Sequence, residues 1–247
     1  MSDESKVALV TGASRGIGRA IAERLCEENF IVIGTATSDA GAQSISAYLK
    51  QLGNGGCGMK LNVTSDDGVA ELVKAVSADF APPLVLVNNA GITKDTLLMR
   101  MKAEEWSDVI DTNLNALYRL SKACLRGMTK ARWGRIINIT SVVGSMGNPG
   151  QSNYAASKAG AEGFSRALAR EIGARSVTVN CIAPGFIDTD MTSELSEDQK
   201  NTMLGQVPLG RLGSPEEIGA LTAFLCSESA GYITGETVHI NGGMYMS

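Results

Sequence analysis

A short apolar run, a glycine-rich loop and a helical pattern open the chain and constrain its fold more than any other feature. Val7 to Val10 is typical of a buried strand, T-G-A-S-R-G-I-G follows at 11–18, and an amphipathic pattern runs from about Ile17 to Glu28. Glycines placed in this way let the backbone approach a pyrophosphate at the amide-rich start of the helix. The sequence therefore predicts a phosphate-binding turn, although glycines that only make a tight turn would give the same pattern.

Strand and helix patterns then alternate to the end of the chain, and no internal repeat, low-complexity tract or linker interrupts them. Such alternation is typical of parallel sheets with helices on both faces. We therefore predict an α/β fold: a single Rossmann-like, doubly wound domain over residues 1–247 with a mostly parallel seven-stranded sheet. The further strands are expected at about 30–35, 57–63, 84–87, 135–139, 178–183 and 237–240, and the further helices at about 39–52, 66–79 and 103–132, and from 154 and 215 onward.

Composition argues against several classes of protein. The net charge of −4 argues against non-specific nucleic-acid binding. The polar start M-S-D-E-S-K does not resemble a secretory signal, and no apolar run approaches the ~18 residues of a membrane span. Five scattered cysteines without a C-x-x-C pair predict reduced thiols in a cytoplasmic protein. Because His239 is the one histidine, we expect no metal site, and acid–base chemistry must use other side chains.

Tyr154 and Lys158 lie four residues apart, so they share one face if a helix begins near Tyr154. A free phenol has a pKa near 10, and a fixed ammonium nearby lowers that pKa. Tyr154 could then exchange a proton with a substrate oxygen that Ser141, just past the apolar run 135–139, holds by a hydrogen bond. The Y-x-x-x-K pattern alone is weak, since a tyrosine and a lysine often share a helix face without any chemistry.

The end of the second expected strand bears on the choice of nucleotide. Its sequence at 34–38, G-T-A-T-S, lacks the acidic residue that would hold the ribose of NAD. Arg15 in the glycine loop could instead pair with a 2′-phosphate, unless it is only a solvated loop charge. Both features favour NADP over NAD, while Asp39, close after the strand, leaves NAD open.

Two other stretches leave alternatives open. Asn113 interrupts the apolar face of the pattern at 103–132, and a buried asparagine without hydrogen bonds costs about 1–3 kcal/mol. It either satisfies a neighbouring backbone group or belongs to the site. Segment 188–210 is polar and irregular and follows a strand, so it is either a lid or a surface excursion.

Several motifs together resemble the pattern of the short-chain dehydrogenase/reductase family. They are T-G-x-x-x-G-x-G at 11–18, N-N-A-G at 88–91, Asn113, Ser141, Y-x-x-x-K at 154–158 and P-G at 184–185. Their order and spacing match from Lys6 to the C-terminus, so the resemblance covers nearly the whole chain. It implies a nicotinamide cofactor and assembly as a homotetramer, through the helix of Tyr154 and the long helix before it.

The resemblance also implies a role for each matching residue. Tyr154 would protonate the developing alkoxide, Lys158 would lower the pKa of the tyrosine and hold the nicotinamide ribose, and Ser141 would orient the substrate carbonyl. Asn113 would hold a water that links Lys158 to solvent. Substrate contacts would come from Ser141 and Tyr154. Besides Tyr154 and Lys158, the positions that would contact the cofactor are Gly12, Ala13, Ser14, Arg15, Gly16, Ile17, Gly18, Thr37, Asn62, Val63, Asn89, Ala90, Gly91, Pro184, Gly185 and Ile187.

Within that family, residues 91–114, 142–151 and the C-terminal stretch I-T-G-E-T-V-H-I-N-G-G-M-Y-M are similar to members that use NADPH to reduce 3-oxoacyl groups on acyl carrier protein. The resemblance implies this substrate, and nothing in the residues themselves does. A reductase of acetoacetyl-CoA or another small ketone is the first alternative. The second is a non-catalytic dinucleotide-binding module, which would not need the four matching polar residues.

Basic residues gather after the long helix and after the helix of Tyr154. Acyl carrier protein is acidic, and so is this chain overall, so docking would require a local basic patch. We expect Arg132 and Arg175 to flank the entrance of the site and steer the carrier. The alternative is that these cations only stabilise the C-terminal ends of helices.

Overall fold

A single parallel sheet of seven strands forms the centre of the molecule in the computed structural model, which describes residues 5–53, 55–189 and 204–246. The strand order is β3-β2-β1-β4-β5-β6-β7, and every neighbouring pair is parallel. The prediction of a doubly wound α/β fold is confirmed. The strands are β1 Val7–Val10, β2 Ile31–Ala36, β3 Cys57–Lys60, β4 Val85–Asn88, β5 Gly134–Ile139, β6 Val177–Pro184 and β7 Thr237–Ile240.

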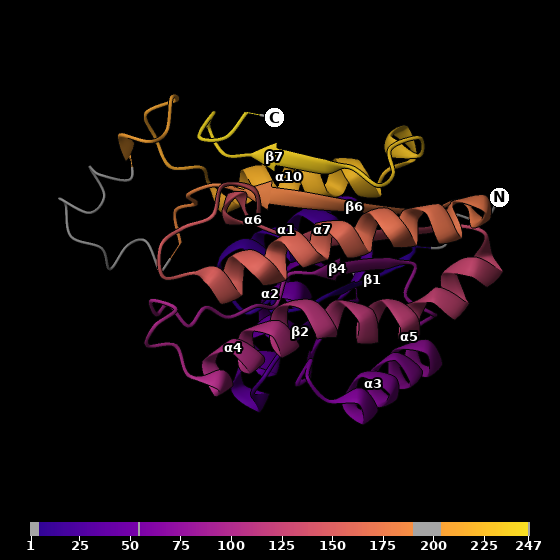
Figure 1. Cartoon of the computed structure of the whole chain (residues 1–247). Helices are drawn as coiled ribbons and strands as arrows, with labels where there is room; N and C mark the ends of the chain where they lie inside the picture. The colour runs from indigo at the N-terminus through magenta and orange to yellow at the C-terminus, as the bar shows by residue number, and fades with distance from the viewer. Residues whose placement is uncertain (1–4, 54, 190–203, 247) are drawn as a thin grey trace.

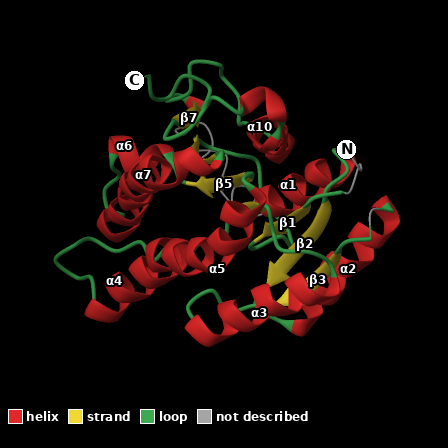
Figure 2. Cartoon of the chain, turned by 90° about the vertical axis from the view of Figure 1, so that its right-hand side faces the viewer, coloured by secondary structure: helices red, strands yellow, loops and turns green. Residues whose placement is uncertain are grey.

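Helices cover both faces of the sheet (Figure 2). One face packs against α1, α2 and α10, and the other packs against α3, α5 and α7. None of the helices that the structure describes is long and apolar enough to span a membrane. The helices are α1 Gly16–Glu27, α2 Asp39–Leu52, α3 Asp66–Asp79, α4 Ala103–Ile110, α5 Ala116–Ala131, α6 Val142–Met146, α7 Ser152–Ile172 and α10 Pro215–Cys226.

Strand β1 shows why two helical layers are needed. All four of its side chains are apolar and fully buried, and successive side chains of a strand point to opposite faces. Val7 and Leu9 join the core beneath α3, α5 and α7, whereas Ala8 and Val10 join the core beneath α1, α2 and α10. A strand that is apolar on both faces is stable only when both faces are covered.

The order of the strands reverses between β1 and β4. The chain passes from β1 outward through β2 to β3, then returns to β4 and continues outward to β7 on the other side. The loops after β1 and β4 therefore leave the sheet side by side and in opposite directions, and in open α/β sheets the crevice that binds ligands lies at this point, at the carboxyl ends of the strands. Thr11 fastens the two loops together, because its Oγ1 accepts hydrogen bonds from the backbone N–H groups of Asn89 and Ala90, both at 3.0 Å.

Three local features differ from the sequence-based expectation. The helix expected at 103–132 is divided by a π-helical turn at Asp111–Asn115, because Asn113 in this turn bonds to a neighbouring loop. The strand expected at 57–63 ends at Lys60. The short helix α6 was not expected; Ser141 caps its first turn by accepting a hydrogen bond from Val143 N–H at 3.2 Å. Of segment 188–210, for which the sequence left a lid and a surface excursion open, residues 190–203 lie outside the described part of the chain.

Candidate active site

The carboxyl edge of the sheet gathers most of the residues that the motifs single out. In Figure 1, β6 and β7 point to the left, and α7 runs back toward the right from that edge. The loops after β1, β2, β3, β4, β5 and β6 carry, in turn, the glycine loop, Thr37, Asn62 with Val63, Asn89 to Gly91, Ser141, and Gly185 with Ile187. Pro184 is the last residue of β6 itself.

The glycines of the loop at 11–18 are required by its shape. Gly12 and Gly16 have φ angles of +66° and +54°, which residues other than glycine rarely adopt. A Cβ atom on Gly18 would lie 2.1 Å from the carbonyl oxygen of Gly12. The tight turn is therefore real, and it brings the backbone of this loop against the start of α1, where a phosphate group would bind.

The start of α1 has the properties of an anion site. Arg15 occupies the N-cap without giving a side-chain cap, and the first turn contains no acidic residue. The first backbone N–H groups of a helix lack intrahelical partners, and the helix dipole favours negative charge there. Arg15 is exposed and has no ion-pair partner among the residues that the structure describes. These residues fit a dinucleotide phosphate.

The end of β2 lies against the glycine loop, since Ala13 N–H donates to Thr35 C=O at 3.0 Å. Thr37, just beyond, is exposed. Asp39, the acid that left NAD open, lies in the first turn of α2 and bonds to Lys60 at 2.7 Å. That hydrogen bond lowers the pKa of Asp39. The carboxylate is thus already engaged, whereas Arg15 is free to meet a phosphate.

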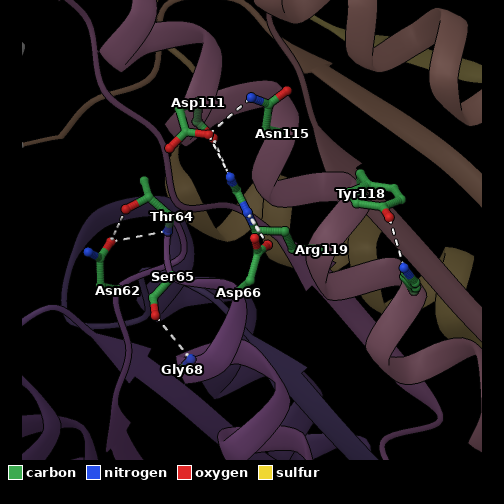
Figure 3. A network of polar contacts seen from close by, with 10 residues as sticks. Asn62, Thr64, Ser65, Asp66, Gly68, Asp111, Asn115, Tyr118 and Arg119 are labelled. Carbon is green, nitrogen blue, oxygen red and sulfur yellow. Dashed lines mark hydrogen bonds and ion pairs between the residues drawn. The ribbon is translucent and has the colours of Figure 1, made fainter.

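The turn after β3 is ordered by its own polar side chains, as Figure 3 shows. Asn62 Oδ1 accepts hydrogen bonds from Thr64 N–H at 3.1 Å and from Thr64 Oγ1 at 2.9 Å. Ser65 caps α3 by accepting a hydrogen bond from Gly68 N–H at 3.0 Å. Asn62 is exposed at the crevice and Val63 is buried beneath it.

The loop after β4 joins the glycine loop to the catalytic candidates. Asn89 Nδ2 donates to the carbonyl oxygens of Thr11 and Gly12, at 2.9 and 3.1 Å. Two residues later, a Cβ atom on Gly91 would lie 3.2 Å from Asn113 Oδ1 and 3.7 Å from Lys158 Nζ. Glycine at 91 therefore keeps the approach to both groups open.

Ser141, Tyr154 and Lys158 meet at the start of α7. Tyr154 lies in the first turn of the helix, and the Nζ of Lys158 lies 5.4 Å from the centroid of its ring. The Nζ donates to Ile139 C=O, the last carbonyl of β5, at 2.8 Å. The Ser141 side chain completes the group, since it lies near enough to the phenol to lower its pKa. The expected shared face is thus present, and the strand end holds the lysine in place.

The pKa of Tyr154 is raised, which is opposite to the direction that the sequence suggested. Burial of the phenol raises this pKa above 10, the nearby Ser141 side chain opposes the rise, and the charge of Asp95 adds to it. Burial also lowers the pKa of Lys158 from 10.5 to about 8. At neutral pH the phenol therefore keeps its proton and the lysine is mostly an ammonium.

Asn113 satisfies a neighbouring backbone, which is one of the two roles that the sequence left open, and it also lies beside the candidate site. Its Oδ1 accepts from Ile92 N–H at 2.8 Å and its Nδ2 donates to Ile92 C=O at 2.9 Å, so it satisfies a neighbouring backbone. Its Nδ2 also lies 3.3 Å from Ser157 Oγ, which donates to Tyr154 C=O at 2.7 Å. Asn113 is therefore part of the site's framework as well. Its expected water-holding role stays a prediction.

The loop after β6 forms the remaining wall of the crevice. Gly185 N–H donates to Ile240 C=O at 3.0 Å, and a Cβ atom on Gly185 would lie 2.7 Å from Asn241 Cβ. Glycine is thus needed for close packing against the end of β7. Ile187 is buried and pairs with Gly213 in an isolated bridge.

Arg132 and Arg175 do not flank the entrance of their own chain's site, which corrects the expectation from the sequence. Arg132 ends α5 just before β5 begins, and Arg175 lies just before the first residue of β6. Both are exposed at the amino edge of the sheet, whereas Ser141 and Tyr154 lie at the carboxyl edge. The 21 residues of α7 separate the two edges by roughly 30 Å.

Sequence reasoning missed two polar residues that hold the site together. Ser157 links Asn113 to the backbone of Tyr154, and Thr11 ties the two loops of the crevice. The signal for Thr11 was its place at a strand end before the first glycine. Ser157 had no distinctive signal, because a serine within a helix is commonplace.

Comparison with known proteins identifies the family of the chain. A family model described as enoyl-(acyl carrier protein) reductase matches residues 12–245. The chain is 64% identical over 247 residues to the 3-oxoacyl-[acyl-carrier-protein] reductase FabG of Pseudomonas aeruginosa, an alignment that covers 100% of both proteins. It is 61% and 60% identical over 246 residues to the proteins of that name from Vibrio cholerae and Escherichia coli, again covering 100% of each.

The chain belongs to the short-chain dehydrogenase/reductase family. Membership makes the protein an oxidoreductase and implies a nicotinamide dinucleotide cofactor. The open start of α1 and the glycine backbone fit such a cofactor independently. The family resemblance expected from the motifs is thereby confirmed.

Proposed function

We propose that this protein reduces 3-oxoacyl-[acyl-carrier protein] to 3-hydroxyacyl-[acyl-carrier protein] with NADPH, during fatty acid elongation. The observation that carries the proposal is the meeting of Ser141, Tyr154 and Lys158 at the carboxyl edge, beside an uncapped helix start that suits a dinucleotide. Full-length identity of 58–64% to reductases named for this substrate supports the choice of substrate.

Tyr154 supplies the proton. A bound nicotinamide would supply the hydride to the carbonyl carbon, and the developing alkoxide then needs a proton on its oxygen. The raised pKa of Tyr154 keeps its phenol protonated until that moment, and the Ser141 side chain lies near it. The same Ser141 hydroxyl would hold the substrate oxygen next to the phenol.

Lys158 and Asn113 support that proton transfer. The ammonium of Lys158, held at Ile139 C=O, stabilises negative charge that forms on the phenol once its proton has left. Asn113 lies beside Gly91 and close to Lys158, where a water could pass a proton inward from solvent. These four side chains form the proposed catalytic set.

NADPH is the proposed cofactor because of the charges around the adenosine end. Arg15 is exposed and unpaired within the described part of the chain, and Thr37 stands at the end of β2 where an acid would select NAD. Asp39 is bound to Lys60. A 2′-phosphate would thus meet a cation and no free carboxylate.

The proposed reaction is at a carbonyl, although the matching family model is described by an enoyl reduction. A phenol that is protonated and lies near a serine is suited to protonate a carbonyl oxygen as hydride arrives. The relatives with the highest identities given above are all named for the 3-oxo substrate. Enoyl reduction is therefore the activity to exclude by experiment.

We also propose a homotetramer, docking of the carrier protein at Arg132 and Arg175, and the cytoplasm as the location. The five cysteines are free thiols, which suits a reducing compartment. Because both arginines lie at the amino edge, they can serve only the site of a neighbouring protomer. The docking proposal therefore depends on the assembly proposal.

The test is the initial rate of NADPH oxidation with four reactions side by side. Acetoacetyl-carrier protein is the substrate, acetoacetyl-CoA and crotonyl-carrier protein are the alternatives at equal concentration, and NADH replaces NADPH as the cofactor control. We expect the fastest rate with acetoacetyl-carrier protein and NADPH. A faster rate with the CoA ester would favour a small-ketone reductase, and a faster rate with crotonyl-carrier protein would favour enoyl reduction. Tight NADPH binding without turnover would indicate a non-catalytic module.

A further inference from the structure

Arg119 joins the adenosine end of the crevice to the catalytic end. It lies in α5, and Figure 3 shows its guanidinium between two carboxylates from different elements. Its Nε donates to Asp66 Oδ1 at 2.7 Å and its Nη2 donates to Asp111 Oδ1 at 2.8 Å. Asp66 opens α3, and Asp111 opens the π-helical turn that contains Asn113.

Hydrogen bonds connect each of the two carboxylates that Arg119 binds to residues of the candidate site. On the α3 side, Ser65 N–H donates to Asn62 C=O at 3.1 Å, so Asp66 follows directly on the ordered turn of Asn62. On the other side, Asn115 Nδ2 donates to Asp111 Oδ1 at 3.0 Å within the π-helical turn. That turn fixes Asn113, whose Nδ2 bonds to Ser157 and so reaches the backbone of Tyr154.

We infer that Arg119 is a positioning residue that couples the adenosine end of the nucleotide site to the π-helical turn carrying Asn113. The inference rests on the proposed nucleotide site and deepens it. A nucleotide that contacts Asn62 and Val63 restricts the motion of the start of α3. Through its ion pairs, Arg119 then restricts the motion of the π-helical turn that carries Asn113. Coupling of this kind needs a contiguous chain of contacts, which these residues provide.

Burial and shape make an arginine suited to this place. The Arg119 side chain is only 15% exposed, while Asp66 is 79% and Asp111 is 34% exposed. A partly buried cation that loses one carboxylate is left poorly compensated, so the two contacts depend on each other. The planar fork of arginine reaches two carboxylates at once, which the single ammonium of lysine does less well.

Arg24 offers a matched control. It also pairs with two carboxylates, Glu27 and Glu28, but all three lie at the C-terminal end of α1, away from the glycine loop at its start. Arg24→Gln removes the same charge and the same number of ion pairs as Arg119→Gln. Any loss that is common to both variants reports only on stability.

The experiment measures NADPH affinity by fluorescence titration and backbone hydrogen exchange at 111–116, with and without NADPH, in wild type, Arg119→Gln and Arg24→Gln. In the wild type we expect NADPH to slow exchange at 111–116. In Arg119→Gln that slowing should disappear, and the Kd for NADPH should rise about 5-fold or more. Arg24→Gln should match the wild type in both measurements.

Asp66→Asn keeps the experiment decisive if Arg119→Gln does not fold, because Asp66 is largely exposed and its loss breaks only one contact. Like Arg119→Gln, this variant should reduce the slowing of hydrogen exchange by NADPH and raise the Kd for NADPH. The inference would be overturned if Arg119→Gln showed the wild-type slowing of hydrogen exchange by NADPH and the wild-type Kd. If Arg119→Gln is unfolded, the same result in Asp66→Asn would overturn it. Absence of turnover with acetoacetyl-carrier protein would overturn the proposed function instead, since neither readout here depends on turnover.

Discussion

The two halves of the carboxyl edge present their polar groups in opposite ways. Around β1, β2 and β3, the candidate groups are backbone amides and exposed side chains such as Arg15, Thr37 and Asn62. Around β4, β5 and α7, the candidate side chains are buried or half-buried: Asn113 is 2% and Lys158 is 6% exposed, and Ser141 and Tyr154 are half-buried. In the proposed reaction, the nucleotide enters and leaves the first half (the nucleotide half) in every cycle, whereas proton transfer in the second half (the catalytic half) needs fixed groups with altered pKa values.

The two halves are vulnerable to different kinds of substitution. In the nucleotide half, function depends on backbone shape and on unpaired charge, so added atoms or altered charges should change binding. In the catalytic half, function depends on pKa values set by burial, so changes there should alter rate more than affinity.

Gly18→Ala should break the nucleotide half most severely. The new Cβ atom would lie 2.1 Å from Gly12 C=O and 2.4 Å from Asn89 Nδ2, so the loop must move. We expect the Kd for NADPH, measured by titration, to rise about 100-fold or more, the equivalent of ~3 kcal/mol. Gly173→Ala is the control, because nothing lies within 4 Å of its Cβ and its φ of −56° suits alanine, so the Kd for NADPH should stay unchanged. Unchanged NADPH affinity in Gly18→Ala would contradict the assignment of the loop.

Arg15→Gln should remove the preference for NADPH without harming NADH. The charge that would meet the 2′-phosphate is lost, so the KM for NADPH should rise about tenfold, as expected for one charged contact of ~1.5 kcal/mol. Arg19→Gln is the matched control, since Arg19 lies in the same helix but is paired with Glu23 at 2.8 Å. Equal losses for NADPH and NADH would refute a phosphate role for Arg15.

The pH profile should report the catalytic half. With Lys158 at a pKa of about 8 and the pKa of Tyr154 raised above 10, both groups are protonated at neutral pH. Loss of the lysine proton as pH rises should lower kcat/KM for the reduction, by about tenfold per pH unit above pH 8. Stopped-flow rates between pH 6 and pH 10 measure this. A profile that stays flat to pH 10 would show that the charge of Lys158 is not needed.

Charge reversal at Arg132 and Arg175 should have the smallest effect. The double variant to Glu should raise the KM for acetoacetyl-carrier protein a few-fold, because steering acts mainly on association. It should leave a free small ketone unaffected, and Lys50→Glu with Lys74→Glu changes the net charge equally as a control. The effect also requires a partner protomer, so sedimentation should detect an oligomer. Equal loss on the carrier substrate and the free ketone would exclude docking at these arginines.

The sequence predicted the architecture well because its signals are local. Helix α2 at Asp39–Leu52, α3 at Asp66–Asp79 and β7 at Thr237–Ile240 fall at the expected boundaries. Caps and apolar periodicity mark the two helices, and the sequence N-G-G at 241–243 marks the end of the strand. The capping box at the start of α10 is local in the same way, because Ser214 and Glu217 are three residues apart. Such features depend only on neighbours along the chain.

The sequence predicted the site less completely, because the geometry and pKa values of the site depend on contacts between residues that are distant in the sequence. The π-helical turn forms where Asn113 bonds to Ile92, a contact between distant segments. The raised pKa of Tyr154 reflects burial that no spacing reveals. The expected position of Arg132 was wrong for a related reason. Arg132 ends α5 just before β5 begins, so it lies at the opposite edge of the sheet from the end of β5 that precedes Ser141.

The most direct test of the catalytic assignment is Tyr154→Phe, with kcat and NADPH affinity measured on the same preparation. The phenol supplies a proton but is not needed to hold the dinucleotide phosphates at α1. We therefore expect kcat with acetoacetyl-carrier protein to fall about 10²–10⁴-fold while the Kd for NADPH stays within a factor of about two. Substantial turnover in Tyr154→Phe would contradict Tyr154 as the proton donor. A parallel collapse of NADPH binding would contradict the division of the carboxyl edge into a nucleotide half and a catalytic half.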